Sequence, residues 1–448
     1  MPCVDSHVTL SDWLSSISSQ HPKTIALGLE RVERVAHAMG FVRADHGIRL
    51  GAHTIVVGGT NGKGSTCAML ESILLQSGFR VATYTSPHLI RFNERLRIQA
   101  EAVNDQTLTE AFERVEAART TLNSASASAE HAVALTYFEF STLAIFDIIQ
   151  RSNVDVAILE IGLGGRLDAV NIVDADCSVL VSVDLDHQEY LGDTREQIGW
   201  EKAHIARRGR PFICADPQPP ASVGQVVAQI GADLWQFGRD FNFQGDPQQW
   251  SWAGRGQRRN AMAYPALRGV NQLLNASAVL ATLAACRELL PVSQGAVRSG
   301  FAMVELPGRF QVLPGQPAVV LDVAHNPHAA AVLAANLDQM GFFPNTVAVV
   351  GMVAGKDAKE VFRRMGTRVD HWCLASLSGA DTNGRPQSAH TLRAELLAVL
   401  PQASCDCFDS PQQAYATAQE KVASNDRIIV FGSFVTVAEI LSIRHARR

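Results

Sequence analysis

A glycine-rich segment around residue 60 carries the residue types that bind phosphate. Glycines allow consecutive backbone N–H groups to converge on phosphate oxygens, and the N-terminus of a following helix adds positive potential. Lys63 supplies a formal charge for the β- and γ-phosphates, and a hydroxyl of Ser65 or Thr66 can bind magnesium. We therefore expect ATP with magnesium to bind at Gly59, Thr60, Asn61, Gly62, Lys63, Gly64, Ser65 and Thr66.

This segment departs at two points from the common phosphate-loop pattern G-x-x-x-x-G-K-[ST]. Val57 stands at the position of the first glycine, and Gly64 separates the lysine from the hydroxyl pair. The alternative is a glycine-rich turn that only reverses the chain. A predicted strand at 53–57 and a predicted helix at 65–76 flank the segment, however, and this order favours nucleotide binding.

Two further candidates stand near the ends of apolar strands. Glu160 ends the strand 156–159, and a carboxylate there, beside a phosphate loop, is placed to bind magnesium. The alternative for Glu160 is an ion pair with Arg166. His187 follows the strand 178–183, and it is either a second metal ligand or a structural histidine.

The elements that position these residues alternate between strand and helix, which is typical of α/β proteins. The strand, phosphate loop and helix are followed at once by a strand at 80–85, an order that implies a parallel crossover. Continuous apolar strands at 154–161 and 177–183 indicate burial on both faces of a sheet. Helices are expected at 105–122, 135–150, 194–207 and 269–286, with short antiparallel strands within 235–256.

A second alternating series begins after Pro307-Gly308. Its strands are expected at 318–323, 346–350, 372–375 and 427–431, and its helices at 328–340, 359–365, 391–399, 411–422 and 435–444. We predict a larger N-terminal parallel-sheet domain, 1–306, that contains the phosphate loop. A smaller, doubly wound, Rossmann-like domain, 307–448, follows a hinge near 306–310.

Composition narrows the class of protein. The chain has 448 residues with 47% hydrophobic residues, enough for a large core, and its net charge of -5 argues against a general nucleic-acid binder. Its eight cysteines contain no CxxC pair and so indicate neither zinc nor a disulfide framework. No secretory signal pattern opens the chain, and the segment 269–286 contains polar residues unsuited to a membrane span. We expect a cytoplasmic protein with no membrane or nucleic-acid partner.

Several motifs together resemble one family. They are Gly-Thr-Asn-Gly-Lys-Gly-Ser at 59–65, Thr-Tyr-Thr-Ser-Pro-His-Leu at 83–89, Leu-Glu-Ile-Gly-Leu-Gly-Gly-Arg-Leu-Asp-Ala at 159–169, Leu-Pro-Gly-Arg-Phe at 306–310 and Asp-Val-Ala-His-Asn-Pro-His at 322–328. In this order, over nearly the whole chain, they resemble the folylpolyglutamate synthases and the bifunctional bacterial dihydrofolate synthases of the Mur ligase-like superfamily. Mur ligases themselves usually place Ser or Thr directly after the lysine.

The resemblance implies roles for individual residues. It implies two magnesium ions held by Ser86, Glu160 and His187, the last because Tyr190-Leu191-Gly192 follows it as in the family. It implies nucleotide contacts at Asn275, Arg309, Asp322 and His325, although Asn271 stands where relatives often carry His or Pro. The alternatives are a helix cap for Asn275 and a hinge ion pair for Arg309.

The resemblance also concerns Lys202 and the acceptor site. The lysine matching Lys202 is carbamylated in the family, whereas the plain interpretation is a surface lysine beside Glu201. Together with Lys63, Glu160 and His187, Lys202 is expected to be catalytic. A pterin site is expected at Thr136, Tyr137, Phe138, Leu167, Asp168 and Ala169, although the aromatic side chains fit equally well in a core.

The activity that the resemblance implies is ATP-dependent amide ligation. Phosphoryl transfer from ATP turns a carboxylate into an acyl phosphate, which the amine of L-glutamate then attacks. The expected acceptors are dihydropteroate and reduced folate glutamates, handled by a monomer. The alternatives are a folylpolyglutamate synthase with one activity, a Mur-type cell-wall ligase and a non-catalytic binding protein that ATP closes around a ligand.

Overall fold

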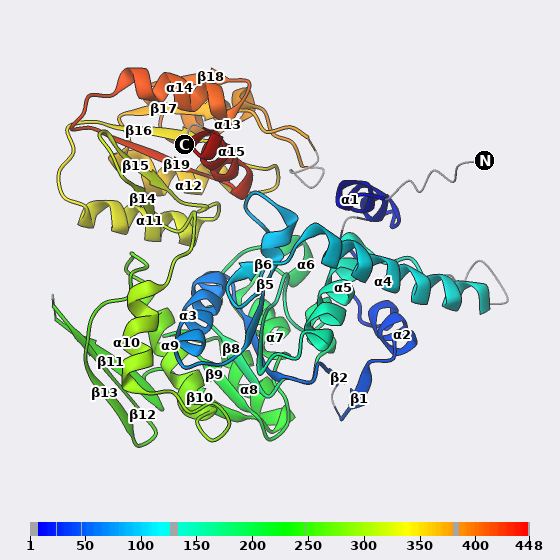
Figure 1. Ribbon diagram of the computed structural model, residues 1–448. Helices are drawn as coiled ribbons and strands as arrows, with labels where there is room; N and C mark the ends of the chain where they lie inside the picture. The colour runs from blue at the N-terminus through cyan, green and yellow to red at the C-terminus, as the bar shows by residue number, and fades with distance from the viewer. Residues whose placement is uncertain are drawn as a thin grey trace, which may run out of the picture. The chain divides into compact units, whose positions relative to one another are not determined.

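The computed structural model describes residues 8–23, 25–45, 47–125, 133–246, 248–379 and 385–446 (Figure 1). The chain forms two compact units. The first comprises Met1–His88, Asn93–Tyr264 and Leu274–Met303, and the second comprises Leu89–Phe92, Pro265–Leu273 and Val304–Arg448. The second unit thus takes in two short segments of the N-terminal part that the predicted division did not include. No helix of the described ranges has the length and apolar character to span a membrane.

The first unit is built on an eight-stranded sheet with the order β10-β9-β8-β3-β7-β4-β5-β6. Neighbouring strands are parallel except at β4–β5 and β5–β6, which are antiparallel. The predicted crossover from β3 to β4 is parallel, and β7 lies between the two strands. The strands are β3 (His53–Gly58), β4 (Val81–Tyr84), β5 (Leu96–Ile98), β6 (Glu101–Ala102), β7 (Val156–Glu160), β8 (Cys177–Leu180), β9 (Pro211–Cys214) and β10 (Asp233–Gln236).

Helices cover this sheet because its central strands carry mostly apolar side chains on both faces. Every residue of β4, β7 and β8 is buried, as expected for parallel strands with helices on both faces. The helices up to residue 303 are α1 (Leu10–Ser19), α2 (Glu30–Ala38), α3 (Lys63–Gln76), α4 (Asp105–Ala125), α5 (Tyr137–Arg151), α6 (Gln188–Leu191), α7 (Arg195–Ala203), α8 (Ala221–Ile230), α9 (Gln272–Ala285) and α10 (Gln294–Met303), with 3₁₀ turns η1 (Phe92–Arg95) and η3 (Ala169–Ile172).

Two small antiparallel sheets complete the first unit. One pairs β1 (Val42–Ala44) with β2 (Gly47–Arg49). The other joins β11 (Phe241–Gly245), β12 (Trp250–Gly254) and β13 (Gln257–Met262). Strands β11 and β12 confirm the antiparallel strands expected within 235–256, whereas β13 lies beyond that range and residues 235–236 belong to the parallel strand β10.

The second unit is a three-layer α/β structure (Figure 1). Its six-stranded sheet has the order β14-β15-β19-β16-β17-β18 and is parallel except at β14–β15. Alternate strand residues pack against α11, α12 and α13 on one face and against α14 and α15 on the other. Its elements are β14 (Gln311–Leu313), β15 (Ala318–Leu321), α11 (Pro327–Gln339), β16 (Thr346–Val350), α12 (Ala358–Met365), η4 (Gly366–Arg368), β17 (His371–Ala375), α13 (Ala389–Val399), β18 (Cys405–Phe408), α14 (Pro411–Lys421), β19 (Arg427–Phe431) and α15 (Phe434–Ala446).

The fold class expected from the sequence is confirmed, with differences at the ends and edges of elements. Helix α7 ends at Ala203 rather than at 207. The guanidinium of Arg207 donates to the carbonyls of Ile205 and Ala206, so these residues turn instead of continuing the helix. Strand β5 and the edge strands β6, β14 and β18 are short and only partly apolar, and the sequence did not predict them.

Candidate active site

The predicted phosphate loop connects the end of β3 to the start of α3. Gly62 caps the helix with φ +92°, and Gly59 has φ +147°, both in a region that favours glycine. A Cβ atom on Gly59 would lie 3.1 Å from the amide nitrogen of Ser182, and one on Gly62 would lie 2.6 Å from Oδ1 of Asn275. The loop therefore needs glycine at both positions, and Asn275 packs directly against it.

Two lysines meet at this loop. Lys63 Nζ donates to the carbonyls of Gly59 (3.1 Å) and Thr60 (3.3 Å), and Lys202 Nζ donates to the same Gly59 carbonyl at 3.1 Å. Lys202 is only 5% exposed, so its interpretation as a surface lysine is wrong. Burial first, and then the charge of Lys63, lower the pKa of Lys202 to about 7, although Asp186 and Asp168 oppose the shift. A substantial fraction of Lys202 is therefore a neutral amine near neutral pH.

This pKa predicts how Lys202 affects stability. Below pH 7 the folded state must bury the charged lysine, and between about 7 and 10.5 only the unfolded state keeps the proton. We expect Lys202→Met to raise the free energy of unfolding most below pH 7. That gain should shrink by about 1.4 kcal/mol per pH unit as pH rises above 7.

The measurement is urea unfolding of wild type and Lys202→Met in carbon dioxide-free buffer at pH 6.5 and 9.5. Lys421→Met, at a partly exposed lysine that pairs with Asp406, serves as the control. A gain that is equal at both pH values would contradict a lowered pKa for Lys202.

Oxygen donors lie close to the phosphate loop at the ends of β4 and β7. Glu160 is buried at the end of β7, and its Oε2 accepts the backbone N–H of Ser86, which follows β4, at 3.2 Å. Arg166 pairs with Glu201 at 2.9 Å rather than with Glu160. The Thr66 hydroxyl in α3 is buried and has no hydrogen-bond partner in the described ranges. These hard oxygen donors fit a magnesium ion.

A pocket joins the phosphate loop to the residues after β7 and β8. It brings together three groups that lie far apart in the sequence, namely the loop, His187 and Lys202. His187 caps α6 with φ +53°, and its backbone N–H donates to Oδ1 of Asp186 at 2.9 Å. The lining residues are Gly59, Thr60, Lys63, Ile161, Gly162, Leu163, Gly164, Asp186, His187 and Lys202.

Some of these lining residues had no predicted role. Ile161, Gly162, Leu163 and Gly164 stand between Glu160 and the expected pterin residues, so their place in the motif at 159–169 is the signal that could have found them. Asp186 precedes the predicted ligand His187.

The aromatic residues that open α5 lie beside this pocket. The ring of Phe138 stacks on Tyr84 with centroids 6.3 Å apart, and a Cβ atom on Gly162 would lie 2.6 Å from Phe138 Cζ. The Arg95 guanidinium lies 5.5 Å from the ring centroid of Tyr137. The Thr136 side chain is engaged in the fold, because it is 3% exposed and caps α5 by accepting the backbone N–H of Glu139.

Asp168 holds the loop after β7 in place. Its carboxylate accepts the backbone N–H of Leu163 at 2.7 Å and of Val170 at 2.9 Å. Burial raises the pKa of Asp168 to about 6, although these amides oppose the shift. On either side of Asp168, the Leu167 carbonyl accepts the N–H of Gly28 at 3.3 Å, and Ala169 is buried in η3.

Two of the nucleotide-binding residues expected in the second unit, Arg309 and His325, lie against the ring of Phe434. Arg309 stacks over the Phe434 ring at 4.9 Å, and the His325 ring lies 6.3 Å from it. Asp322, which is partly buried, accepts the backbone N–H groups of Phe310 and Ala324, each at 2.8 Å. Burial raises the pKa of Asp322, and Arg309 acts against that shift.

Known proteins match this chain over almost its whole length. Residues 308–434 match the family described as Mur ligase, glutamate ligase domain. The chain is 38% identical to the dihydrofolate synthase/folylpolyglutamate synthase of Escherichia coli K12 over 98% of its own length and 96% of that protein. Among solved structures, E. coli FolC in complex with DHPP and ADP superposes with a TM-score of 0.88, at 38% identity and 98% coverage of both chains. A bifunctional folylpolyglutamate synthase/dihydrofolate synthase from Yersinia pestis, complexed with AMPPNP and Mn ion, gives a TM-score of 0.85 at 38% identity and the same coverage.

Proposed function

The chain belongs to the dihydrofolate synthase/folylpolyglutamate synthase family of Mur-type ligases, and from this premise we propose that it is bifunctional. It adds L-glutamate to dihydropteroate and to reduced folate glutamates, with ATP activating each acceptor carboxylate as an acyl phosphate. The pocket that unites the phosphate loop with His187 and Lys202 is the observation that carries the proposal. The E. coli relative bears both activities in its name.

The residues of the first unit position and neutralise the phosphates. Phosphoryl transfer depends on charge neutralisation and alignment more than on covalent help from the protein. We propose that the loop amides and Lys63 hold the β- and γ-phosphates, since Lys63 Nζ now rests on loop carbonyls that phosphate oxygens can replace. Ser86, Glu160 and His187 would hold magnesium, which when bound neutralises the phosphate oxygens. Asn275 packs against Gly62 and so supports the loop.

We also propose that Lys202 is carbamylated and that the site binds two magnesium ions. Carbamylation requires a neutral amine, and the lowered pKa of Lys202 provides one near neutral pH. The product is an anion, which would remove the repulsion between Lys202 and Lys63. Methylation of the folded protein would trap the carbamate as a methyl ester, and mass spectrometry of the tryptic peptide that contains Lys202 would then show the added mass.

The acceptor is proposed to lie against Phe138 and the loop that Asp168 holds. Phe138 offers an aromatic face beside pocket-lining Gly162, which suits a flat pterin ring. Tyr137, Leu167 and Ala169 belong to the same proposed site. We assign Thr136 to shaping it, because its hydroxyl already caps α5.

The second unit is proposed to bind glutamate and part of the nucleotide. Residues 308–434 match a glutamate ligase domain, and this supports the glutamate assignment. Arg309, Asp322 and His325 are proposed as its nucleotide contacts. We propose that the whole protein is a monomer and that it is cytoplasmic. Sedimentation of the purified protein would test whether it is a monomer.

An acceptor comparison tests the proposed function. We expect magnesium-dependent ADP release from ATP and L-glutamate with dihydropteroate, and again with a reduced folate monoglutamate. Each rate should be at least about tenfold above the rate without acceptor. Release with the folate alone would favour a folylpolyglutamate synthase with one activity, and release only with a cell-wall nucleotide peptide would favour a Mur-type ligase. Nucleotide binding without release in any mixture would indicate a non-catalytic binding protein.

A further inference from the structure

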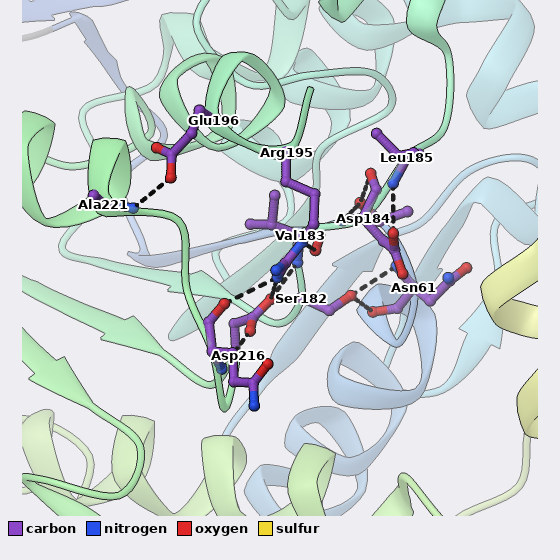
Figure 2. A network of polar contacts seen from close by, with 11 residues as sticks. Asn61, Ser182, Val183, Asp184, Leu185, Arg195, Glu196, Asp216 and Ala221 are labelled. Carbon is purple, nitrogen blue, oxygen red and sulfur yellow. Dashed lines mark hydrogen bonds and ion pairs between the residues drawn. The ribbon is translucent and has the colours of Figure 1, made fainter. Parts of the chain in front are cut away.

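An ion pair outside the pocket holds the backbone of the loop that follows β8. Asp216 follows β9 and is 4% exposed, and its Oδ2 accepts the Val183 N–H at 2.7 Å. The same oxygen lies 3.3 Å from Nη2 of Arg195, whose Nε donates to the Val183 carbonyl at 2.9 Å. Both polar backbone atoms of Val183 are therefore bonded to members of one ion pair (Figure 2).

The residues on either side of Val183 bind the phosphate loop. The Ser182 hydroxyl accepts the Asn61 N–H at 3.0 Å and donates to the Asn61 carbonyl at 2.9 Å. The Ser182 carbonyl accepts the Thr60 N–H at 2.8 Å. On the other side, the Asp184 N–H donates to Thr60 Oγ1 at 2.9 Å, and that hydroxyl donates to the Asp184 carbonyl at 3.2 Å. Figure 2 shows Ser182 and Asp184, the neighbours of Val183, beside Asn61 of the phosphate loop. A shift of Val183 would therefore move the loop.

The same pair fixes the start of α7, the helix that carries Lys202. Arg195 is the first residue of α7, and its Nη2 also donates to the Gln218 carbonyl at 3.0 Å. The next residue, Glu196, accepts the N–H groups of Ala221 and Ser222 at the start of α8, at 3.0 and 2.8 Å. One ion pair thus connects the phosphate loop, the segment leading to His187 and the helix of Lys202.

We infer that the Arg195–Asp216 pair positions the nucleotide site for phosphoryl transfer. Neither residue lines the pocket, so both act through Val183 and its neighbours rather than on the substrate. The inference rests on the proposed function, because it concerns the same site. A guanidinium with Nε and Nη donors suits this task, since it reaches a carbonyl and a carboxylate at once in fixed geometry.

The test uses full-length Arg195→Met and Asp216→Ala variants. Methionine keeps an apolar stem and removes the donors, and we expect it to lower kcat/KM for ATP about 10- to 100-fold, because small misplacements of reacting groups have effects of that size. The Kd of a non-hydrolysable ATP analogue with magnesium should rise about tenfold or more, whereas the KM of the folate acceptor should change less than twofold. The double variant should be no worse than Asp216→Ala, because both substitutions break one unit.

Asp176→Ala provides a matched control. Asp176 also joins a strand amide to an arginine, since it accepts the Thr54 N–H at 3.0 Å and Nη1 of Arg49 at 2.9 Å. It lies before β8, at the end of the sheet opposite the phosphate loop. Its removal should lower the unfolding temperature as Asp216→Ala does while leaving the Kd of the ATP analogue and kcat/KM for ATP unchanged. Compared with Arg195→Met, Arg195→Lys should recover part of the affinity for the ATP analogue, because the lysine ammonium keeps the charge. The recovery should be incomplete, because a single ammonium replaces the several donors of the guanidinium.

The outcomes separate the inference from the proposed function. Weaker analogue binding by folded Arg195→Met supports the inference even if wild type shows no turnover, in which case the proposed function fails alone. If wild type turns over and Arg195→Met binds the analogue as wild type does, the pair has no positioning role. An equal loss in Asp176→Ala would also overturn the inference, because general destabilisation would then explain it. If Asp216→Ala fails to fold, Arg195→Met is the deciding variant, because Arg195 is partly exposed and its substitution disturbs the core less.

Discussion

Lys63→Ala should lower magnesium-dependent ADP release at least 100- to 1000-fold, which is about the cost of removing a charged donor from developing transition-state charge. Lys63 is the first residue of α3, and its Nζ donates to the Gly59 and Thr60 carbonyls of the loop. The alanine variant keeps the glycines and the helix start, so the loop can form but lacks its cation. The loss should appear in both kcat and the affinity for ATP. The measurement is a coupled ADP-release assay together with titration of a non-hydrolysable ATP analogue.

Lys421→Ala is the control for this variant. Lys421 ends α14 in the second unit and pairs with Asp406 at 3.1 Å on the protein surface. Its removal should leave ADP release within about twofold of wild type, since exposed ion pairs contribute little. Both proteins should unfold at temperatures within a few degrees of wild type. A Lys63→Ala protein with the wild-type rate would show that the glycine segment is not the phosphate site.

The sequence was sufficient where local chemistry and periodicity act together. The loop between β3 and α3 could be located because glycines, a cation and hydroxyls stand between an apolar strand and a helix, and each feature restricts the others. The central strands could be located because β3, β7 and β8 are apolar runs buried on both faces. The parallel crossover followed from the order of elements.

What the sequence could not supply depends on tertiary contacts. Lys202 stands beside Glu201 in a polar stretch, and only the fold shows that its ammonium is buried against Gly59 while Glu201 pairs with Arg166. Thr136 caps α5 in a capping box with Glu139 three residues later, so its hydroxyl serves the fold, although the spacing of the two residues is visible in the sequence. Asp216 and Arg195 stand on different elements, and no spacing rule connects them to Val183.

The sequence also did not predict which segments of the chain belong to the second unit. Leu89–Phe92 and Pro265–Leu273 join it although they precede the predicted hinge. Leu89 packs against the core cluster of α14 and α15, and Val270 donates to Asn336 of α11 at 2.8 Å. Such contacts arise between segments distant in sequence, so composition gave no indication of them.

Glu160→Gln should raise the magnesium concentration needed for half-maximal ADP release and lower the maximal rate. Metal ions supply several kcal/mol to such transition states, and losing that stabilisation corresponds to about 100-fold or more in rate. Glutamine keeps the size of the side chain, and its carbonyl oxygen can still accept the Ser86 N–H that Glu160 accepts at 3.2 Å. The substitution therefore removes charge at a buried strand end and leaves the local structure intact.

Glu71→Gln is the control for this variant. It tests whether the loss of another buried carboxylate in the same unit would change the magnesium dependence as well. Glu71 is 6% exposed in α3 and pairs with Arg97 at 2.7 Å, so its substitution breaks a partly buried ion pair. We expect Glu71→Gln to lower the unfolding temperature without changing the magnesium dependence of ADP release. We expect Glu160→Gln to change that magnesium dependence while leaving the unfolding temperature close to that of wild type. Binding of Mn²⁺ with an ATP analogue, followed by electron paramagnetic resonance, gives a readout that does not need turnover. If Glu160→Gln binds Mn²⁺ as wild type does, the carboxylate at the end of β7 is not a metal ligand, and the charge that neutralises the phosphates must come from Lys63 and the loop amides.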